Sequence, residues 1–285
     1  MRPAERRLAL GLYRAGPRRH LLAAALDLGV TALDTAANYQ HHQAHRVLAD
    51  QAGPLLHRFD LTTKIGYFPG GHDLDPARLR TAADQAARDL GRSPDTLLLH
   101  NPEHDPAGFA RAAEELARLR ERGRIRHWGV STWNPAPLLA HLDGVPRPDV
   151  LMTRSGLAVP AHVLDAGDRL AERLRPRHRW GMAPFGGNPA DSLWQQLDTR
   201  PFLARRCTAP ALQAALAIAY GTPPVERIAA GTSDPAHLAE LATATRDIET
   251  DPDTLARYRT LLREAATVRE HREAGGDNAR AAEPG

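Results

Sequence analysis

The sequence of 285 residues lacks the features that mark membrane and secreted proteins. It has a single cysteine, Cys207, so an intramolecular disulfide is impossible. Its aliphatic runs are short and interrupted by Arg or Asp, and none approaches the roughly 20 apolar residues of a membrane-spanning helix. The first ten residues carry charges but no apolar stretch of signal-peptide length. We therefore expect a cytoplasmic protein that has no membrane partner.

Lysine is almost absent, because Lys64 is the only lysine among 37 basic residues and the rest are arginine. The formal net charge of +3 is spread along the chain and forms no basic arm or stripe, so nucleic acid is not expected as a partner. Arg serves wherever a cation only has to be soluble or pair with a carboxylate. The solitary Lys64 therefore indicates a site that needs a compact ammonium, unless it is a chance surface residue.

The rest of the composition, with 42% hydrophobic and 25% charged residues, is that of an ordinary globular protein. Short β-type runs alternate with amphipathic helical stretches, repeating roughly every 30 residues. Strands are predicted at residues 8–12, 32–35, 59–65, 96–100, 127–131, 149–153, 179–184 and 227–230. The clearest helices are predicted at 76–90 and 106–122, each with Pro near its start and Gly just after its end.

This alternation predicts an α/β protein, a closed (β/α)8 TIM barrel in a single domain. A doubly wound open sheet is the weaker alternative, because no Gly-x-Gly-x-x-Gly motif follows the first predicted strand. One more helix is predicted at 252–272. We expect the barrel domain to span residues 1–272, and residues 273–285, rich in Gly, Ala and charge, to form a disordered tail.

Four polar residues lie at or just after the carboxyl ends of predicted strands, where barrel enzymes place catalytic groups. Asp34 ends the second strand and Tyr39 follows it, Lys64 ends the third strand, and His100 ends the fourth. We expect them to converge, because charged groups that follow buried aliphatic runs are costly to bury unless they pair with one another. Singly, Asp34 could be a helix cap, His100 a core histidine and Tyr39 a packing residue. The lone lysine among them favours a functional site.

Five sequence blocks occur in a fixed order along the chain. They are Leu-Asp-Thr-Ala-Ala-Asn-Tyr at 33–39, Leu-Thr-Thr-Lys at 61–64, Leu-Leu-Leu-His-Asn-Pro at 97–102, Gly-Arg-Ile-Arg-His-Trp-Gly-Val-Ser-Thr at 123–132 and Ala-Gly-Thr-Ser-Asp-Pro-Ala-His-Leu at 230–238. In order and spacing they resemble the aldo-keto reductase family, over nearly the whole chain. The resemblance implies an NAD(P)H-dependent oxidoreductase whose catalytic tetrad falls on Asp34, Tyr39, Lys64 and His100.

This tetrad suits hydride transfer between nicotinamide and a carbonyl or hydroxyl compound: an aldehyde, a ketone, a sugar-like substrate or an imine. Charge that grows on the carbonyl oxygen must be protonated, and Tyr39 is the expected general acid and base. Lys64 is expected to lower the pKa of the phenol from about 10, and Asp34 to keep Lys64 charged. His100 is expected to orient the substrate oxygen. The hydride itself belongs to the cofactor.

The cofactor contacts that the resemblance implies carry over only in part. Ser131 matches a family Ser, but Thr132 and Met152 stand where relatives have an Asn and a Gln that hold the nicotinamide carboxamide. Met182 stands where an aromatic ring often stacks on the nicotinamide. The full set of expected cofactor-binding residues is Ser131, Thr132, Met152, Met182, Pro184, Phe185, Gly231, Thr232, Ser233 and His237.

The turn at 231–233 resembles the family's phosphate-binding turn, which leads into a helix. Many NADPH-preferring relatives place a Lys and an Arg around it, where this sequence has Gly231 and His237. NADPH is nevertheless predicted over NADH. Arg227 and Arg246 are close enough in sequence to take the place of the missing cations.

Tyr13, Asn101 and Trp133 are the expected substrate-pocket residues, and they predict a pocket of mixed character. The C-terminal region that often supplies a specificity loop is short, which indicates either an open site or one that a partner subunit closes. The sequence does not fix the oligomeric state.

Two other functions are compatible with the pattern. One is a nicotinamide-binding regulatory subunit of the same fold with little turnover, which the two missing amide side chains favour. The other is a metal-dependent hydrolase, which the 14 histidines suggest. No His-x-His motif lies on an early strand, so no metal is expected, and His41, His42 and His45 are predicted to form a solvated surface.

Overall fold

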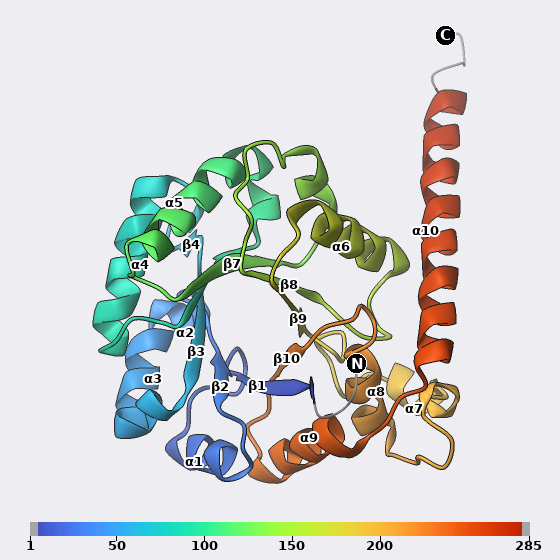
Figure 1. Ribbon diagram of the computed structural model, residues 1–285, viewed down its shortest axis with the longest axis horizontal. Coiled ribbons are helices and arrows are strands. Elements are labelled where there is room, and N and C mark those ends of the chain that lie inside the picture. The colour runs from blue at the N-terminus through green and yellow to red at the C-terminus, as the bar shows by residue number, and fades with distance from the viewer. Residues whose placement is uncertain (1–4, 281–285) are drawn as a thin grey trace.

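The protein is a closed barrel of parallel strands inside a ring of helices (Figure 1). The computed structural model describes residues 5–280, and the side chains up to residue 267. The barrel strands are β1 (Arg7–Gly11), β2 (Ala32–Asp34), β3 (Asp60–Ile65), β6 (Thr96–His100), β7 (His127–Thr132), β8 (Val150–Arg154), β9 (His178–Met182) and β10 (Arg227–Ala230). Each pairs with its neighbours in chain order, and β1 closes on β10. The predicted (β/α)8 fold is confirmed.

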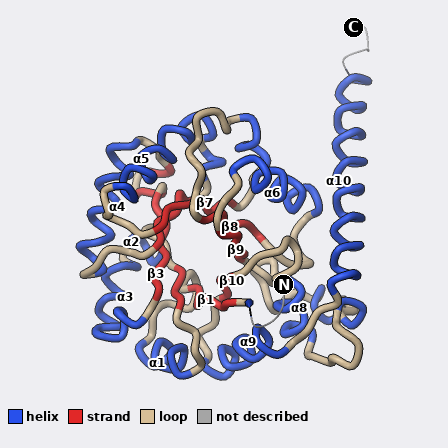
Figure 2. The backbone as a smooth tube through the Cα atoms, in the orientation of Figure 1, coloured by secondary structure: helices blue, strands red, loops and turns tan. Residues whose placement is uncertain are grey.

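Helices cover the outside of the barrel (Figure 2). They are α1 (Arg19–Asp27), α2 (Tyr39–His42), α3 (Ala44–Ala52), α4 (Pro76–Leu90), α5 (Phe109–Glu121), α6 (Ala161–Leu174), α7 (Leu193–Gln196), α8 (Ala211–Ala219), α9 (Pro235–Asp247) and α10 (Pro252–Arg280). Short 3-10 turns are η2 (Gly53–Arg58), η3 (Pro102–His104), η4 (Pro106–Gly108), η5 (Ala136–Ala140) and η6 (Arg200–Phe202). Only η5 connects β7 to β8, so one of the eight units has no α-helix.

Local sequence signals explain where α4 begins and ends. Asp75 caps its first turn by accepting a hydrogen bond from the Arg78 backbone N–H at 2.9 Å. Gly91 ends the helix in the left-handed conformation, with φ of 67°, which a residue without Cβ adopts most readily. The predicted helix at 106–122 is split, because the Pro-containing turn η4 precedes α5.

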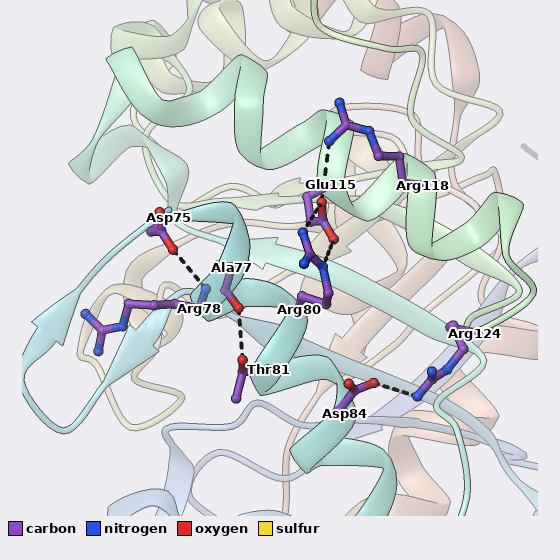
Figure 3. A network of polar contacts seen from close by, with 9 residues as sticks. All are labelled: Asp75, Ala77, Arg78, Arg80, Thr81, Asp84, Glu115, Arg118 and Arg124. Atoms are coloured by element: carbon purple, nitrogen blue, oxygen red, sulfur yellow. Dashed lines mark hydrogen bonds and ion pairs between the residues drawn. The ribbon is translucent and has the colours of Figure 1, made fainter.

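A buried carboxylate joins α4 to α5 (Figure 3). Glu115 on α5 is almost fully buried and accepts two hydrogen bonds from Arg80 on α4, at 2.7 and 3.1 Å. Arg118 lies 3.5 Å from the same carboxylate. Two guanidinium groups therefore balance the buried charge of Glu115, and the pair of helices is fixed against β3 and β6.

Alternation along each strand decides which side chains enter the barrel. Strand side chains point to opposite faces in turn, so every second residue shares a face. The inner face carries the cluster Ala9, Ala32, Leu98, Val150, Met152, Trp180 and Ala229. The intervening residues pack outward against the helices, as Leu33, Leu61, Leu97, Leu99 and Val130 do. The next inward positions, at the carboxyl ends of the strands, are therefore those of the candidate site.

Helix α10 is longer than the sequence predicts. It continues to Arg280, so residues 273–280, which were expected to begin a disordered tail, are helical. Each residue added to an existing helix gains a backbone hydrogen bond, which favours such an extension. Figure 1 shows α10 running past α6 and away from the barrel. The remainder of the expected tail, residues 281–285, lies outside the described residues.

The expected solvated surface of three histidines is wrong for His45. His41 is exposed and His42 half-buried, but His45 on α3 is buried and its Nε2 lies 2.7 Å from the Thr63 hydroxyl. The reason is helical periodicity, which turns His45 toward β3 together with Leu48. Burial lowers the pKa of His45 to about 4.

We expect His45 to make folding stability depend on pH. Its folded pKa lies below its unfolded value of about 6.5, so stability is complete above pH 6.5 and decreases as the pH falls toward 4. The loss is about 3 kcal/mol at one histidine. Urea unfolding of the wild type and of His45→Gln at pH 7.5 and 4.5 should show a smaller pH effect in the variant. His20→Gln, at an exposed position of α1, is the matched control, and equal pH effects in all three proteins would contradict the assignment.

Candidate functional site

A buried ion pair forms the floor of the site. Lys64 Nζ lies 2.7 and 2.6 Å from the two carboxylate oxygens of Asp34 and donates to the Thr35 carbonyl at 3.0 Å. The lysine is 2% exposed. Burial by itself lowers the pKa of Lys64, but the Asp34 charge and the Tyr39 phenol outweigh it and raise that pKa. The ammonium is therefore fixed and charged, and no proton donor of Lys64 is left without a partner.

Tyr39 lies directly beside this ammonium. It follows β2 at the start of α2, and its ring centroid is 5.5 Å from Lys64 Nζ. The sequence predicts a lowered phenol pKa, but burial raises the pKa of Tyr39 more than Lys64 lowers it, and Asp34 raises it further. That expectation is corrected for a simple reason: a group removed from water resists ionisation. Tyr39 is therefore protonated at neutral pH.

His100 faces Tyr39 from the end of β6, with the two ring centroids 6.0 Å apart. Burial lowers the pKa of His100 well below 6.5, and the nearby Lys64, His72 and His104 lower it further. The imidazole is therefore neutral. Within the described residues its Nδ1 is buried without a hydrogen-bond partner.

The β4 (Tyr67–Phe68) and β5 (Gly71–His72) hairpin brings aromatic residues against His100 that the sequence analysis did not identify. His72 Nε2 donates to the His100 carbonyl at 2.9 Å, and the Tyr67 ring lies 5.0 Å from the imidazole. Gly66 permits this approach, since a Cβ there would stand 3.2 Å from the His100 carbonyl oxygen. The sequence could indicate these residues only through their closeness to Lys64 along the chain. The two strands of the hairpin have two residues each, too few for an alternating pattern.

The expected substrate-pocket residues lie at the same end of the barrel. Tyr13 is 64% exposed and its ring lies 4.8 Å from that of Tyr39. Asn101 donates to the Tyr67 hydroxyl at 3.2 Å. Trp133 follows β7 and is 42% exposed. All three therefore border the mouth of the barrel.

The segment after Tyr39 has an unusual backbone. Gln40, His41 and His42 have φ angles of 50°, 54° and 65°, the left-handed region. Such a conformation costs roughly 1–2 kcal/mol for each residue that has a Cβ. Strained backbone of this kind gathers at functional sites, and here it directly follows the candidate proton donor.

The expected nicotinamide contacts are brought together only in part. Ser131 points inward and its hydroxyl lies 3.8 Å from the Met182 sulfur. Met152 belongs to the inner apolar cluster, whereas Thr132 is in the outward register and its hydroxyl is buried with no partner among the described residues. Pro184 is buried, and Phe185 packs on Trp194 with ring centroids 6.0 Å apart.

The turn after β10 permits close backbone approach, and its described residues 231–237 include no Lys or Arg. A Cβ on Gly231 would stand 2.8 Å from the Gly11 carbonyl oxygen. Thr232 and Asp234 stabilise the turn, with Asp234 accepting from the Ala236 N–H at 2.8 Å at the start of α9. His237 is exposed beside that carboxylate, at 3.9 Å, and Ser233 is exposed. The negative charge of Asp234 at this helix start would repel a bound phosphate.

Arg227 and Arg246 do not take the place of the missing cations. Arg227 is at the amino end of β10, where it pairs with Asp60 at 2.8 Å and stacks on Trp180. Arg246 is in the last turn of α9 and donates to the Leu28 carbonyl. The turn joins the carboxyl end of β10 to the start of α9, so both arginines lie at the far ends of these elements. The donor set thus fits a nicotinamide beside Ser131 but provides no Lys or Arg clamp for a 2′-phosphate.

None of the helices among the described residues combines the length and the apolar character that crossing a membrane requires.

Comparison with known proteins finds one family that the chain resembles. Residues 15–152 match the model of the aldo/keto reductase family. An aldo-keto reductase of Mycobacterium sp. (strain KMS) is 33% identical over 139 residues, 48% of this chain and 49% of the relative. Oxidoreductase YdhF of Escherichia coli is 31% identical over 124 residues, 39% of this chain and 41% of the relative. The chain thus spans about half the length of the curated relatives it matches.

Solved structures share the whole barrel. A holo aldo-keto reductase from Bacillus halodurans superposes with a TM-score of 0.71 at 18% identity, covering 90% of this chain and 91% of that one. An aldo/keto reductase from Klebsiella pneumoniae, solved with NADP and acetate, gives 0.67 at 22% identity, covering 90% and 91%. Residues 15–152 are thus similar to the aldo-keto reductase family, and the whole barrel shares the fold of solved aldo-keto reductases.

Proposed function

We propose that the protein is a nicotinamide-dependent oxidoreductase that interconverts a carbonyl and a hydroxyl, with Tyr39 as general acid and base. The substrate class is an aldehyde, a ketone or a sugar-like compound, and an imine fits the same chemistry. The observation that carries the proposal is the buried Lys64–Asp34 ion pair under a protonated phenol, opposite a neutral imidazole. This is an arrangement for protonating an oxygen at the mouth of the barrel.

Each member of the tetrad has a distinct role in this proposal. Bound nicotinamide supplies the hydride. Tyr39 donates its phenolic proton to the carbonyl oxygen, and Lys64 stabilises the phenolate that remains. Asp34 keeps the lysine charged in a buried setting where it would otherwise lose its proton. The neutral His100 hydrogen-bonds the same oxygen and orients it.

NADPH is the cofactor we propose over NADH. Two of the structural neighbours, both from Klebsiella pneumoniae, were solved with NADP or NADPH, which supports a nicotinamide nucleotide. Ser131 is the candidate for the carboxamide and the backbone around Gly231 for the pyrophosphate. The acidic cap at Asp234 and the absence of an arginine or lysine at this described turn imply a weak preference for the 2′-phosphate.

A second function is favoured by one observation. Met152 fills the position where relatives carry an amide side chain, and Thr132 keeps its hydroxyl buried. A barrel that holds nicotinamide through fewer contacts could act as a regulatory subunit with little turnover. Cofactor binding without carbonyl reduction is the result that would favour it.

Replacing the proposed acid should strongly reduce turnover without removing the cofactor site. Tyr39→Phe should lower kcat/KM for aldehyde-dependent NADPH oxidation by about 10²–10⁴-fold, the usual contribution of a general acid. Its affinity for NADPH, measured by tryptophan fluorescence, should stay close to that of the wild type. Tyr258→Phe on α10 removes the same hydroxyl outside the site and serves as the control. Full activity in Tyr39→Phe would rule out the assigned role.

The pH dependence should differ between the two directions. Reduction needs protonated Tyr39, whose pKa is raised, and neutral His100, whose pKa is well below 6.5. Its kcat/KM should therefore be flat between about pH 6 and 9. Oxidation needs the phenolate and should rise with pH over that range. An acid limb of the reduction profile near 6.5 would indicate that His100 titrates, against the assignment.

Adding a cation to the phosphate turn should strengthen NADPH binding selectively. His237→Arg places a guanidinium in the first turn of α9, and one charge-assisted contact to the 2′-phosphate should tighten NADPH binding about tenfold or more. NADH affinity should not change. Thr243→Arg adds the same charge at an exposed position further along α9. If both variants behave alike, the turn does not hold the 2′-phosphate.

A further inference from the structure

Arg154 is an inward-facing cation at the mouth of the barrel that the tetrad does not use. It is the last residue of β8, two residues beyond Met152 and four beyond Val150, both of which belong to the inner cluster. The alternation of the strand therefore directs Arg154 toward the barrel interior. It is in register with Met182 on β9, whose sulfur contacts the Ser131 hydroxyl.

The guanidinium of Arg154 is held in place by Trp133, but part of its hydrogen-bonding capacity is unused. Its Nε donates to the Trp133 carbonyl at 3.0 Å, and its central carbon lies 4.8 Å from the centre of the Trp133 ring. Within the described residues no hydrogen bond or ion pair occupies Nη1 or Nη2, and the side chain is half-buried. A fixed guanidinium that keeps two donor groups free is suited to a planar anion.

One carboxylate, that of Glu103, lies near this cation; its Oε1 is hydrogen-bonded, whereas its Oε2 is buried without a hydrogen-bond partner among the described residues. Glu103 Oε1 accepts from the backbone N–H groups of Trp133 and Asn134, at 2.7 and 2.9 Å. Its charge favours the protonated form of Arg154, while burial lowers the pKa of that guanidinium. Glu103 thus fixes the loop after β7, on which Arg154 stacks. The loops after β6 and β7 and the end of β8 are therefore connected.

We propose that Arg154 determines specificity by binding a carboxylate of the carbonyl substrate, with the exposed face of Trp133 supporting the carbon chain. The inference rests on the proposed carbonyl reduction, and it names the substrate class: an aldehyde or ketone that carries an acid group.

The register also indicates the separation of the two groups. His100 is paired with Ser131 on β7, and Ser131 with Met152 on β8, so two strand spacings lie between the His100 and Met152 backbones. At roughly 5 Å per spacing this is about 10 Å across the strands, and Arg154 lies two residues, about 7 Å, further along β8. A carboxylate separated from the carbonyl by several bonds spans such a gap after both side chains reach inward. A 2-oxo acid, with adjacent groups, does not.

The test compares 4-formylbenzoate with 4-formylbenzamide, which has the same shape without the charge. Binding of each is measured by calorimetry, and kcat/KM by NADPH oxidation, for the wild type, Arg154→Met and Arg154→Lys. Arg147→Met is the matched control, since Arg147 is exposed just before the opposite end of β8 and donates to the Arg175 carbonyl.

We expect the wild type to prefer the carboxylate by about tenfold or more, as one charge-assisted contact provides. Arg154→Met should remove the preference by raising the KM for 4-formylbenzoate. Arg154→Lys should keep part of the preference for 4-formylbenzoate, and Arg147→Met should keep the full preference.

Three results would overturn the proposal: equal affinity of the wild type for both compounds, an unchanged preference in Arg154→Met, or binding of neither compound. Failure of the proposed function would be seen differently. In that case 4-formylbenzoate would still bind in an Arg154-dependent way, while neither compound would be reduced.

Discussion

The site depends on one interaction, the ion pair between Lys64 and Asp34 inside the barrel. An ammonium that is 2% exposed would be too costly to keep charged without a carboxylate at 2.6–2.7 Å. With it, a positive charge is fixed where β2 and β3 end. The pair determines which proton states its neighbours adopt, because its field acts on Tyr39 and His100 through a water-poor interior. Loss of either partner would leave a buried, uncompensated charge.

Burial raises the pKa of Tyr39, whereas the positive charge of Lys64 lowers it. Burial prevails, so the phenol keeps its proton, but Lys64 remains in place to stabilise the phenolate once the proton has left. His100 experiences the same two effects with the same sign, since both burial and the nearby cations disfavour imidazolium. The buried Lys64 charge thus lies beside two groups with defined proton states: Tyr39, which keeps its proton, and His100, which is neutral.

The chain follows the family pattern more closely at the proposed catalytic positions than at the expected cofactor contacts. Residues 15–152, the matched segment, contain Asp34, Tyr39, Lys64, His100 and Ser131. Departures from the family pattern lie within this segment, at Thr132 and Met152, and after it, at Met182 and in the acidic turn before α9. A barrel allows such variation, because each loop at its carboxyl end can change without disturbing the strands that hold the others.

The sequence by itself determined the strands, the helices 76–90 and 252–272 in outline, and the place of Asp34, Tyr39, Lys64 and His100 at or near strand ends, because periodicity and strand ends are local properties. It also marked Lys64 through the rarity of lysine. Tertiary structure decided what depends on distant neighbours. It buried His45, raised rather than lowered the pKa of Tyr39, and brought the β4–β5 hairpin to His100. It also removed Arg227 and Arg246 from the phosphate turn and left Arg154 with free donors at the barrel mouth. Burial, charge separation and free hydrogen-bonding capacity are properties of packing, so they appear only when the strands have closed.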